Sequence, residues 1–314
     1  MRNSSRRVAF IGISVAVAVG VTTLTGACGA RPTATVGDMA VAAPTPTIAT
    51  APAQTSPSQT TPPAATPSSP PATSPEVGPR LDPQPLLAAA QGIEPNTTLG
   101  AVVFDRVTGR ELLAMDPDRQ FRSASLVKVL IAIDALRSGG ANPMERQRIA
   151  NMLSTSDDGI ASSLWVKYGP DIVPRMAATL GLQHTEAPEV AGKWGEVKVT
   201  ARDMVRVYQY VMDNLLPEDH KLIVDALARA SEVAADGFNQ FFGIPHGLNT
   251  QWAIKQGWGN NSTAMVLHST GLVGGGYRYV VILLTEHPLG SGWRRAAESV
   301  TAAAGALTGL LPDA

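Results

Sequence analysis

Residues 121–140 read FRSASLVKVLIAIDALRSGG, and the apolar run Leu126–Leu136 within them decides how the chain folds. Almost every position of this run is apolar, which predicts a helix buried on all sides and stopped by Gly139-Gly140. Lys128 lies inside the run, where an unpaired ammonium is so unfavourable that the lysine must be paired or lose its proton. Ser125, one helical turn earlier, shares its face, and a hydroxyl beside a desolvated amine can be an activated nucleophile.

Ser125 and Lys128 do not carry this interpretation alone. A Ser-x-x-Lys tetrad arises by chance roughly once in a chain of this length. The alternative is a helix-capping serine followed by a lysine that extends its amine to solvent. The rest of the chain has to decide between the two.

The N-terminal residues 1–28 have the pattern of a lipoprotein signal peptide. Three arginines precede the apolar run Val8–Leu24, and small residues lead to Cys28, the only cysteine of the chain. Thr25 stands where a lipobox has an aliphatic residue. We therefore expect Cys28 to be lipidated (palmitate) and the protein to be exported and held on the extracytoplasmic side of the cell membrane; an uncleaved signal anchor is the alternative.

Residues 29–80 consist mainly of Pro, Thr, Ala and Ser, a composition that cannot bury enough apolar surface to fold. We expect a disordered tether that holds residues 81–314, the folded domain, away from a membrane. Without the signal peptide the net charge is about −4, and no basic patch indicates nucleic-acid binding. The histidines lack metal-ligand spacing, so we expect neither a metal nor another cofactor, and we expect a monomer.

Strand patterns at both ends of the folded domain enclose a helical region, which predicts an α+β fold: one antiparallel sheet flanked by helices. The expected strands are Thr98–Val107 and Arg110–Met115, joined by a hairpin at Thr108-Gly109, then Gln251–Trp258, Ala264–Val273 and Tyr277–Thr285. The expected helices, besides the buried one, are Pro83–Gln91, Pro143–Leu153, Ile160–Lys167, Asp171–Leu180, Thr200–Leu215, Asp219–Ala235 and Trp293–Leu311.

Four segments in this order resemble the penicillin-recognising active-site serine superfamily, and the class A β-lactamases above all. Ser125-Leu126-Val127-Lys128 matches the nucleophile tetrad, Ser156-Asp157-Asp158 stands in the place of Ser-Asp-Asn, and Lys255-Gln256-Gly257 in the place of Lys-Thr-Gly. Thr200–Met204 resembles the helix start after the omega loop. The resemblance covers residues 83–311 and implies a β-lactamase or transpeptidase-like fold. Fewer residues separate Ser125 from Ser156 along the sequence than in class A enzymes, which implies a reduced helical subdomain.

The resemblance also implies roles for these residues. Ser125 would attack a carbonyl, Lys128 would take its proton, and Ser156 and Lys255 would pass a proton to the leaving group. The N–H groups of Ser125 and Trp258 would form the oxyanion hole. Asp158, Gln256, Gly257 and Trp258 would contact the substrate, and Gly257 leaves room for a substrate backbone on the strand edge.

Asp158 and Gln256 depart from the family pattern. An ionised Asp158 only accepts hydrogen bonds, and it would favour the charged form of Lys128 and weaken it as a base. The alternative for Asp158 is that it caps the helix beginning at Gly159. Gln256 replaces a hydroxyl that would bind a substrate carboxylate, so carboxylate affinity should fall.

The segment 183–199, QHTEAPEVAGKWGEVKV, lacks the Glu-x-x-Leu-Asn motif of the omega loop. Glu186, Glu189 and Glu196 are interpreted as surface acids, so the resemblance implies an acyl-enzyme that persists. Three hypotheses remain open: acyl transfer through Ser125 on a β-lactam or a D-Ala-D-Ala-like peptide, a weak β-lactamase, and an inactive domain that binds cell-wall peptide or a protein.

Overall fold

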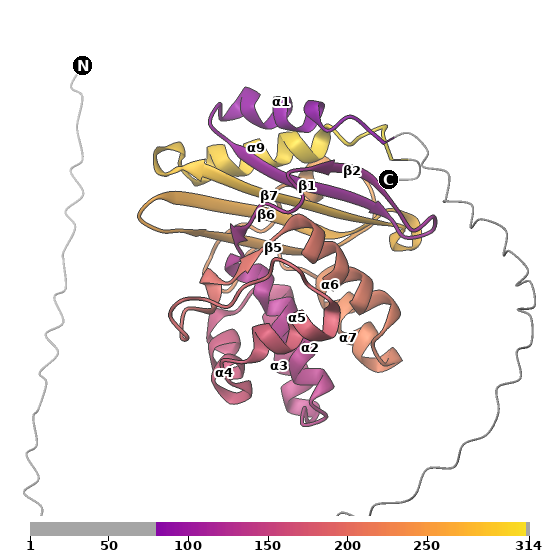
Figure 1. Ribbon diagram of the computed structural model, residues 1–314, viewed down its shortest axis with the longest axis vertical. Coiled ribbons are helices and arrows are strands. Elements are labelled where there is room, and N and C mark those ends of the chain that lie inside the picture. The colour runs from indigo at the N-terminus through magenta and orange to yellow at the C-terminus, as the bar shows by residue number, and fades with distance from the viewer. Residues whose placement is uncertain (1–79, 312–314) are drawn as a thin grey trace, which may run out of the picture. The chain divides into compact units, whose positions relative to one another are not determined.

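The strands at both ends of the folded domain form one antiparallel sheet in the computed structural model of the protein, which describes residues 80–311 (Figure 1). The strands are β1 (Thr98–Asp105), β2 (Arg110–Met115), β5 (Trp252–Asn260), β6 (Ala264–Val273) and β7 (Tyr279–Pro288), in the spatial order β2-β1-β7-β6-β5. Strand β1 pairs with β7 along its whole length, from Thr98 opposite Glu286 to Asp105 opposite Tyr279. This pairing unites the first and last strands, as the sequence predicts.

Helices cover both faces of the sheet, and this confirms the predicted α+β architecture. Helices α1 (Gln84–Ile93) and α9 (Trp293–Gly305) pack together on one face, and the remaining long helices lie on the other (Figure 1). Those on the second face are α2 (Val127–Arg137), α3 (Pro143–Thr155), α4 (Asp158–Tyr168), α5 (Ile172–Leu180), α6 (Ala201–Asp213) and α7 (Pro217–Ala228). A sheet covered on both faces needs near-continuous apolar strands, which explains the sequences of β6 and β7.

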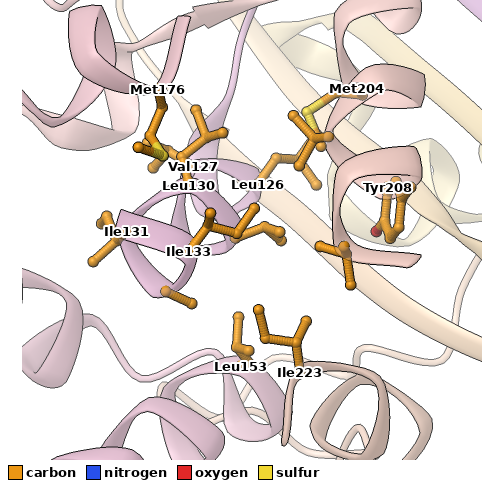
Figure 2. Close-up of a cluster of buried hydrophobic side chains, with 14 of the residues drawn as sticks. Leu126, Val127, Leu130, Ile131, Ile133, Leu153, Met176, Met204, Tyr208 and Ile223 are labelled. Carbon is orange, nitrogen blue, oxygen red and sulfur yellow. The ribbon is translucent and has the colours of Figure 1, made fainter. Parts of the chain in front are cut away.

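Helix α2 is the centre of the larger core cluster, and every residue from Val127 to Leu136 is buried. Figure 2 shows its apolar side chains surrounded by those of four other helices: Leu153 of α3, Met176 of α5, Met204 and Tyr208 of α6, and Ile223 of α7. Each fully buried aliphatic side chain contributes about 1.5–3 kcal/mol by the hydrophobic effect. The helix is therefore held rigidly, and so is the turn that precedes it.

Short elements complete the fold around that turn. The turn is the 3₁₀ helix η1 (Ala124–Leu126), which is in contact with a second one, η2 (Trp194–Glu196). Strand β3 (Phe121–Arg122) directly precedes η1 and pairs with β4 (Lys198–Val199), which follows η2. The short helix α8 (Ile244–Gly247) packs against α9.

Two helices are shorter than the sequence predicts. The helix expected over Asp219–Ala235 is α7, which ends at Ala228. Beyond it the backbone N–H groups of Ser231 and Ala235 donate to the carbonyls of Ser154 and Thr155, at 2.9 and 2.8 Å, so the chain turns back to the end of α3. Helix α9 ends at Gly305 rather than Leu311, and tighter turns follow it.

The predicted signal peptide (1–28) and, apart from Arg80, the predicted tether (29–80) lie outside the described residues. Within residues 80–311, no helix combines the length and the apolar character that crossing a membrane requires.

Candidate active site

Ser125 lies in the turn η1, which strand β3 and helix α2 hold from both sides. The preceding residue, Ala124, has a φ of +45°, a left-handed conformation that residues with a Cβ adopt rarely. The N–H of Ser123 donates to the carbonyl of Val197 at 2.6 Å, and the imidazole Nε2 of His268 lies 2.7 Å from the carbonyl of Arg122. These bonds keep a strained backbone in place, and Ser125 keeps 6% of its surface exposed.

Lys128 lies directly beside Ser125, as the spacing predicts. Its side chain is fully buried, and its Nζ lies 2.8 Å from the Ser125 Oγ. The same Nζ lies 2.6 Å from the carbonyl oxygen of Ser156, 3.2 Å from the Ser156 Oγ and 2.5 Å from the Asp158 Oδ1. A buried lysine in the first turn of an apolar helix therefore has polar partners.

The number of protons on Lys128 decides what it can do to Ser125. A carbonyl and a carboxylate only accept hydrogen bonds, so the Lys128 Nζ donates to Ser156 and Asp158 in either state. The remaining position on the nitrogen faces Ser125. In the ammonium it is a third N–H, and in the amine it is a lone pair that can accept the hydroxyl proton.

Ser156 joins Lys128 to a second buried lysine. It ends α3 with a φ of +56°, and this left-handed turn carries its carbonyl and its hydroxyl to the same point. The Nζ of Lys255, on β5, donates to the Ser156 Oγ at 2.9 Å and to the carbonyl of Gln256 at 2.9 Å. The structure thus brings together the four residues predicted to be catalytic.

The two lysines differ in how far the site disfavours their charge. Burial lowers the pKa of Lys128, and the carboxylate of Asp158 opposes that effect. Burial lowers the pKa of Lys255 well below its ordinary value, and the nearby charge of Lys128 lowers it further, against the attraction of Asp158 and Asp236. Lys255 is therefore the group that more readily gives up its proton.

The sequence leaves open whether Asp158 caps the helix or contacts Lys128, and in the structure Asp157 is the cap and Asp158 makes the contact. The N-cap of α4 is Asp157, whose Oδ1 accepts from the N–H of Ile160 at 2.8 Å. Asp158 is the first residue of the helix and forms the ion pair with Lys128, although 65% of its side chain is exposed. The expectation that Asp158 acts on the charge of Lys128 thus has a direct contact to support it.

Gln256 does not point where the sequence predicts. Its Nε2 donates to the carbonyls of Gln240 and Phe242, at 2.9 and 2.6 Å, and its side chain is buried. Side chains alternate along β5, so Gln256 lies on the face opposite Lys255. Its predicted contact with a substrate is wrong for this arrangement: the amide positions the loop before α8.

Gly257 shares the face of Lys255, but the space beside it is occupied by the protein. A Cβ at this position would lie 2.9 Å from the carbonyl oxygen of Ser123 and 3.2 Å from the Leu126 Cγ. The glycine therefore lets β5 pack against the turn that carries Ser125, which corrects the prediction of room for a substrate backbone.

Two indole rings lie over the lysine amines. The Lys128 Nζ is 5.1 Å from the centroid of the Trp194 ring, and the Lys255 Nζ is 5.9 Å from that of Trp258. Trp258 also stacks on Phe238 and donates from Nε1 to the Asp236 Oδ2 at 2.9 Å. The prediction missed Asp236, because the preceding helix was expected to run on to Ala235.

The acids of the segment 183–199 remain apart from the nucleophile. Glu196 pairs with Arg122 at 2.9 Å, and Glu186 pairs with Lys198 at 3.8 Å. Glu186, Glu189 and Glu196 instead line a separate pocket of about 520 Å³. Within the described residues, none of the three is hydrogen-bonded to Ser125 or Lys128, and no group of acidic and histidine side chains is arranged to hold a metal ion.

Solved structures with this fold include β-lactamases and PBP-A. A β-lactamase from Sphaerobacter thermophilus superposes with a TM-score of 0.55 at 21% identity and covers 74% of this chain and 100% of its own. A class A β-lactamase from Bacteroides cellulosilyticus gives 0.59 at 12% identity, over 74% and 99%. The structure of PBP-A gives 0.56 at 18% identity, over 73% and 97%. At these identities the likeness establishes the fold.

A closer relation exists at the level of sequence, although no family model matches the chain. The proteins named "Putative lipoprotein LppW" from Mycobacterium bovis and Mycobacterium tuberculosis are 33% identical to it over 220 residues. These residues make up 67% of this chain and 68% of each relative. The chain therefore belongs to the LppW family, and its folded domain has the fold of the penicillin-recognising active-site serine superfamily.

Proposed function

We propose that this chain is a cell-envelope lipoprotein whose folded domain transfers an acyl group to Ser125. The observation that carries the proposal is the unbroken set of contacts from the Ser125 Oγ to the Lys128 Nζ, the Ser156 Oγ and the Lys255 Nζ. The acyl donors are a β-lactam or a D-Ala-D-Ala-like peptide, the classes that the resemblance implies.

Each step has a group to carry it. The Ser125 Oγ forms a bond to the donor's carbonyl carbon, and its proton passes to the uncharged Lys128 Nζ 2.8 Å away. When the carbonyl–nitrogen bond breaks, the leaving nitrogen takes up a proton through the Ser156 Oγ, which both lysines reach. Hydrolysis of the acyl-enzyme needs a base for water, and within the described residues no acid of segment 183–199 is hydrogen-bonded to Ser125 or Lys128. The acyl-enzyme is therefore long-lived.

A second candidate function is binding without turnover. The contact of 2.5 Å between the Lys128 Nζ and Asp158 favours it, because a paired ammonium offers Ser125 no lone pair. A domain in this state would hold a cell-wall peptide or a protein partner in place of transforming it.

A time course with a fluorescent penicillin separates these functions. The full chain and its Ser125→Ala variant are incubated with the reagent, and intact mass is followed from seconds to hours. We expect an adduct on the native chain that persists for hours and is absent from the variant. An adduct that forms and disappears with release of product would indicate a weak β-lactamase. The absence of an adduct on the native chain at every time would contradict acylation by β-lactams and favour the binding function.

Anchoring through Cys28 is supported by the N-terminal sequence and by the word lipoprotein in the name of the LppW relatives. Expression with labelled palmitate should label the native chain in the membrane fraction. Cys28→Ser should abolish the label and release the exported chain from the membrane. Equal labelling of both forms would contradict this anchor.

A further inference from the structure

Among the described residues, the side chains of Gln256 and Lys255 on β5 both have their amino or amide groups bonded within the protein. The Gln256 amide is turned away and both its bonds go to backbone carbonyls. The Lys255 Nζ is buried and bonded to Ser156 and to the carbonyl of Gln256. A carboxylate brought to β5 would thus meet groups whose hydrogen bonds are already made.

An exposed carboxylate faces the site instead. The loop after α7 returns to the end of α3 and places Asp236 beside Trp258, where its Oδ2 accepts from the indole at 2.9 Å and its Oδ1 accepts from the N–H of Phe238 at 3.0 Å. These two bonds orient the carboxylate. Within residues 80–311, Asp236 forms no ion pair with a lysine or arginine.

The surrounding charges make this end of the site negative. Asp158 is in contact with Lys128, whereas the carboxylates of Asp236 and Asp157 accept hydrogen bonds from uncharged N–H groups. The indole faces of Trp194 and Trp258 add to the effect, because aromatic faces favour positive charge.

We propose that the site selects an acyl donor carrying a positively charged group, held by Asp236 next to Trp258, over a donor carrying a carboxylate. This inference rests on the proposed function and specifies the substrate class of the same site. A β-lactam or peptide with its carboxylate free is then a slow donor, and the same compound with a cationic group is a fast one.

Three thioesters that share one acyl group provide the test. Their thiols are thiocholine, its uncharged isostere 3,3-dimethylbutanethiol and the anionic 3-mercaptopropionate. Acyl transfer forms the bond from the Ser125 Oγ to the carbonyl carbon, breaks the carbon–sulfur bond and passes the serine proton to the leaving thiolate. The rate of the Ser125 adduct is measured by intact mass on the full chain. Each rate is divided by the rate at which the same ester hydrolyses without protein, because the three thiols differ as leaving groups. On this corrected scale we expect the thiocholine ester to react about threefold to tenfold faster than the neutral ester, and the anionic ester to be the slowest.

Two variants test whether Asp236 is responsible for the preference for the cationic ester. Asp236→Asn should bring the cationic and neutral esters to similar corrected rates. Glu218→Gln removes the same charge in the first turn of α7, about 15 Å along the helix from its last residue, Ala228, and should leave the ratio unchanged. At about 1 M salt the ratio of the cationic to the neutral rate should also decrease, because salt then screens electrostatic interactions beyond about 3 Å.

The outcomes separate this inference from the proposed function. If no thioester labels Ser125, the acyl transfer is wrong, and the charge preference is then measured as binding of the same three esters to the Ser125→Ala chain by tryptophan fluorescence. Equal binding or equal rates for all three, or a preference for the anionic ester, would overturn the inference. A preference for the cationic ester that survives Asp236→Asn would overturn the role of Asp236.

Discussion

The balance between Lys128 and Asp158 decides at the residue scale whether Ser125 can react. Spacing and burial predict the contact of Ser125 with Lys128, since both follow from local sequence. The choice between a cap and a site residue for Asp158 could not be made from sequence, because Asp157 and Asp158 are both acids at a helix start. The turn geometry of Ser156, with its φ of +56°, settles which of them meets the lysine.

The Asp158→Asn variant should increase acylation of Ser125. Removing the carboxylate lowers the pKa of Lys128 further, so more of the lysine is uncharged at neutral pH. We expect the rate at pH 7 to rise by about tenfold and the pH–rate profile to shift towards lower pH, measured with the fluorescent penicillin. Asp157→Asn, which removes a charge but retains a good cap, is the matched control and should change the rate much less. A lower rate in Asp158→Asn would show that the carboxylate assists the reaction.

The close approach of β5 to the turn η1 positions the site at the scale of elements. Sequence patterns predict β5 to within two residues at each end and predict that Lys255 and Gly257 share a face. The same alternation places Gln256 on the opposite face, and its assignment to the substrate came from the family resemblance, which overrode the geometry of the strand. The early end of α7 was not predictable, because it depends on bonds from Ser231 and Ala235 to a distant helix.

Gly257→Ala should destabilise the protein because the added Cβ would lie 2.9 Å from a backbone carbonyl that cannot move freely. Overpacking of this kind costs about 1–3 kcal/mol in the free energy of unfolding, measured by urea denaturation. Gly259→Ala is the control on the same strand, since its Cβ would lie 3.9 Å from that of Ala124, an ordinary contact. Equal stability of the two variants would contradict a tight contact between β5 and η1.

The sheet as a whole buries two histidines that cannot be protonated without cost. Burial lowers the pKa of His268 to about 4 and that of His287 to about 4. The uncharged His268 ring is bonded on both sides, to the carbonyl of Arg122 and to the N–H of Thr285. The sequence shows that the histidines lack metal-ligand spacing, but it cannot show the pKa of His268, which depends on burial that only the folded sheet creates.

Stability should therefore fall as the pH is lowered from about 6.5 to about 4. In this window the unfolded chain binds protons at these histidines and the folded chain does not, so protons favour unfolding. The loss is about 3 kcal/mol for each histidine, measured as the free energy of unfolding in urea at several pH values. His268→Asn should remove about half of the dependence, because His287 remains, and His246→Asn, at an exposed position, should leave it unchanged. An unchanged slope in His268→Asn would refute this assignment.

The pairing of β1 with β7 sets the order in which the protein can fold. It joins residues such as Val102 and Ile282, which are 180 positions apart, and contacts at such separations make folding slow. The sheet cannot close until the last strands have left the ribosome, and η1 lacks its contact with β5 until then. The apolar residues of the helical cluster that pack against the sheet are exposed in the meantime, which makes the unfinished chain prone to aggregation. The contact of β5 with the turn that carries Ser125 is thus one of the last features to form.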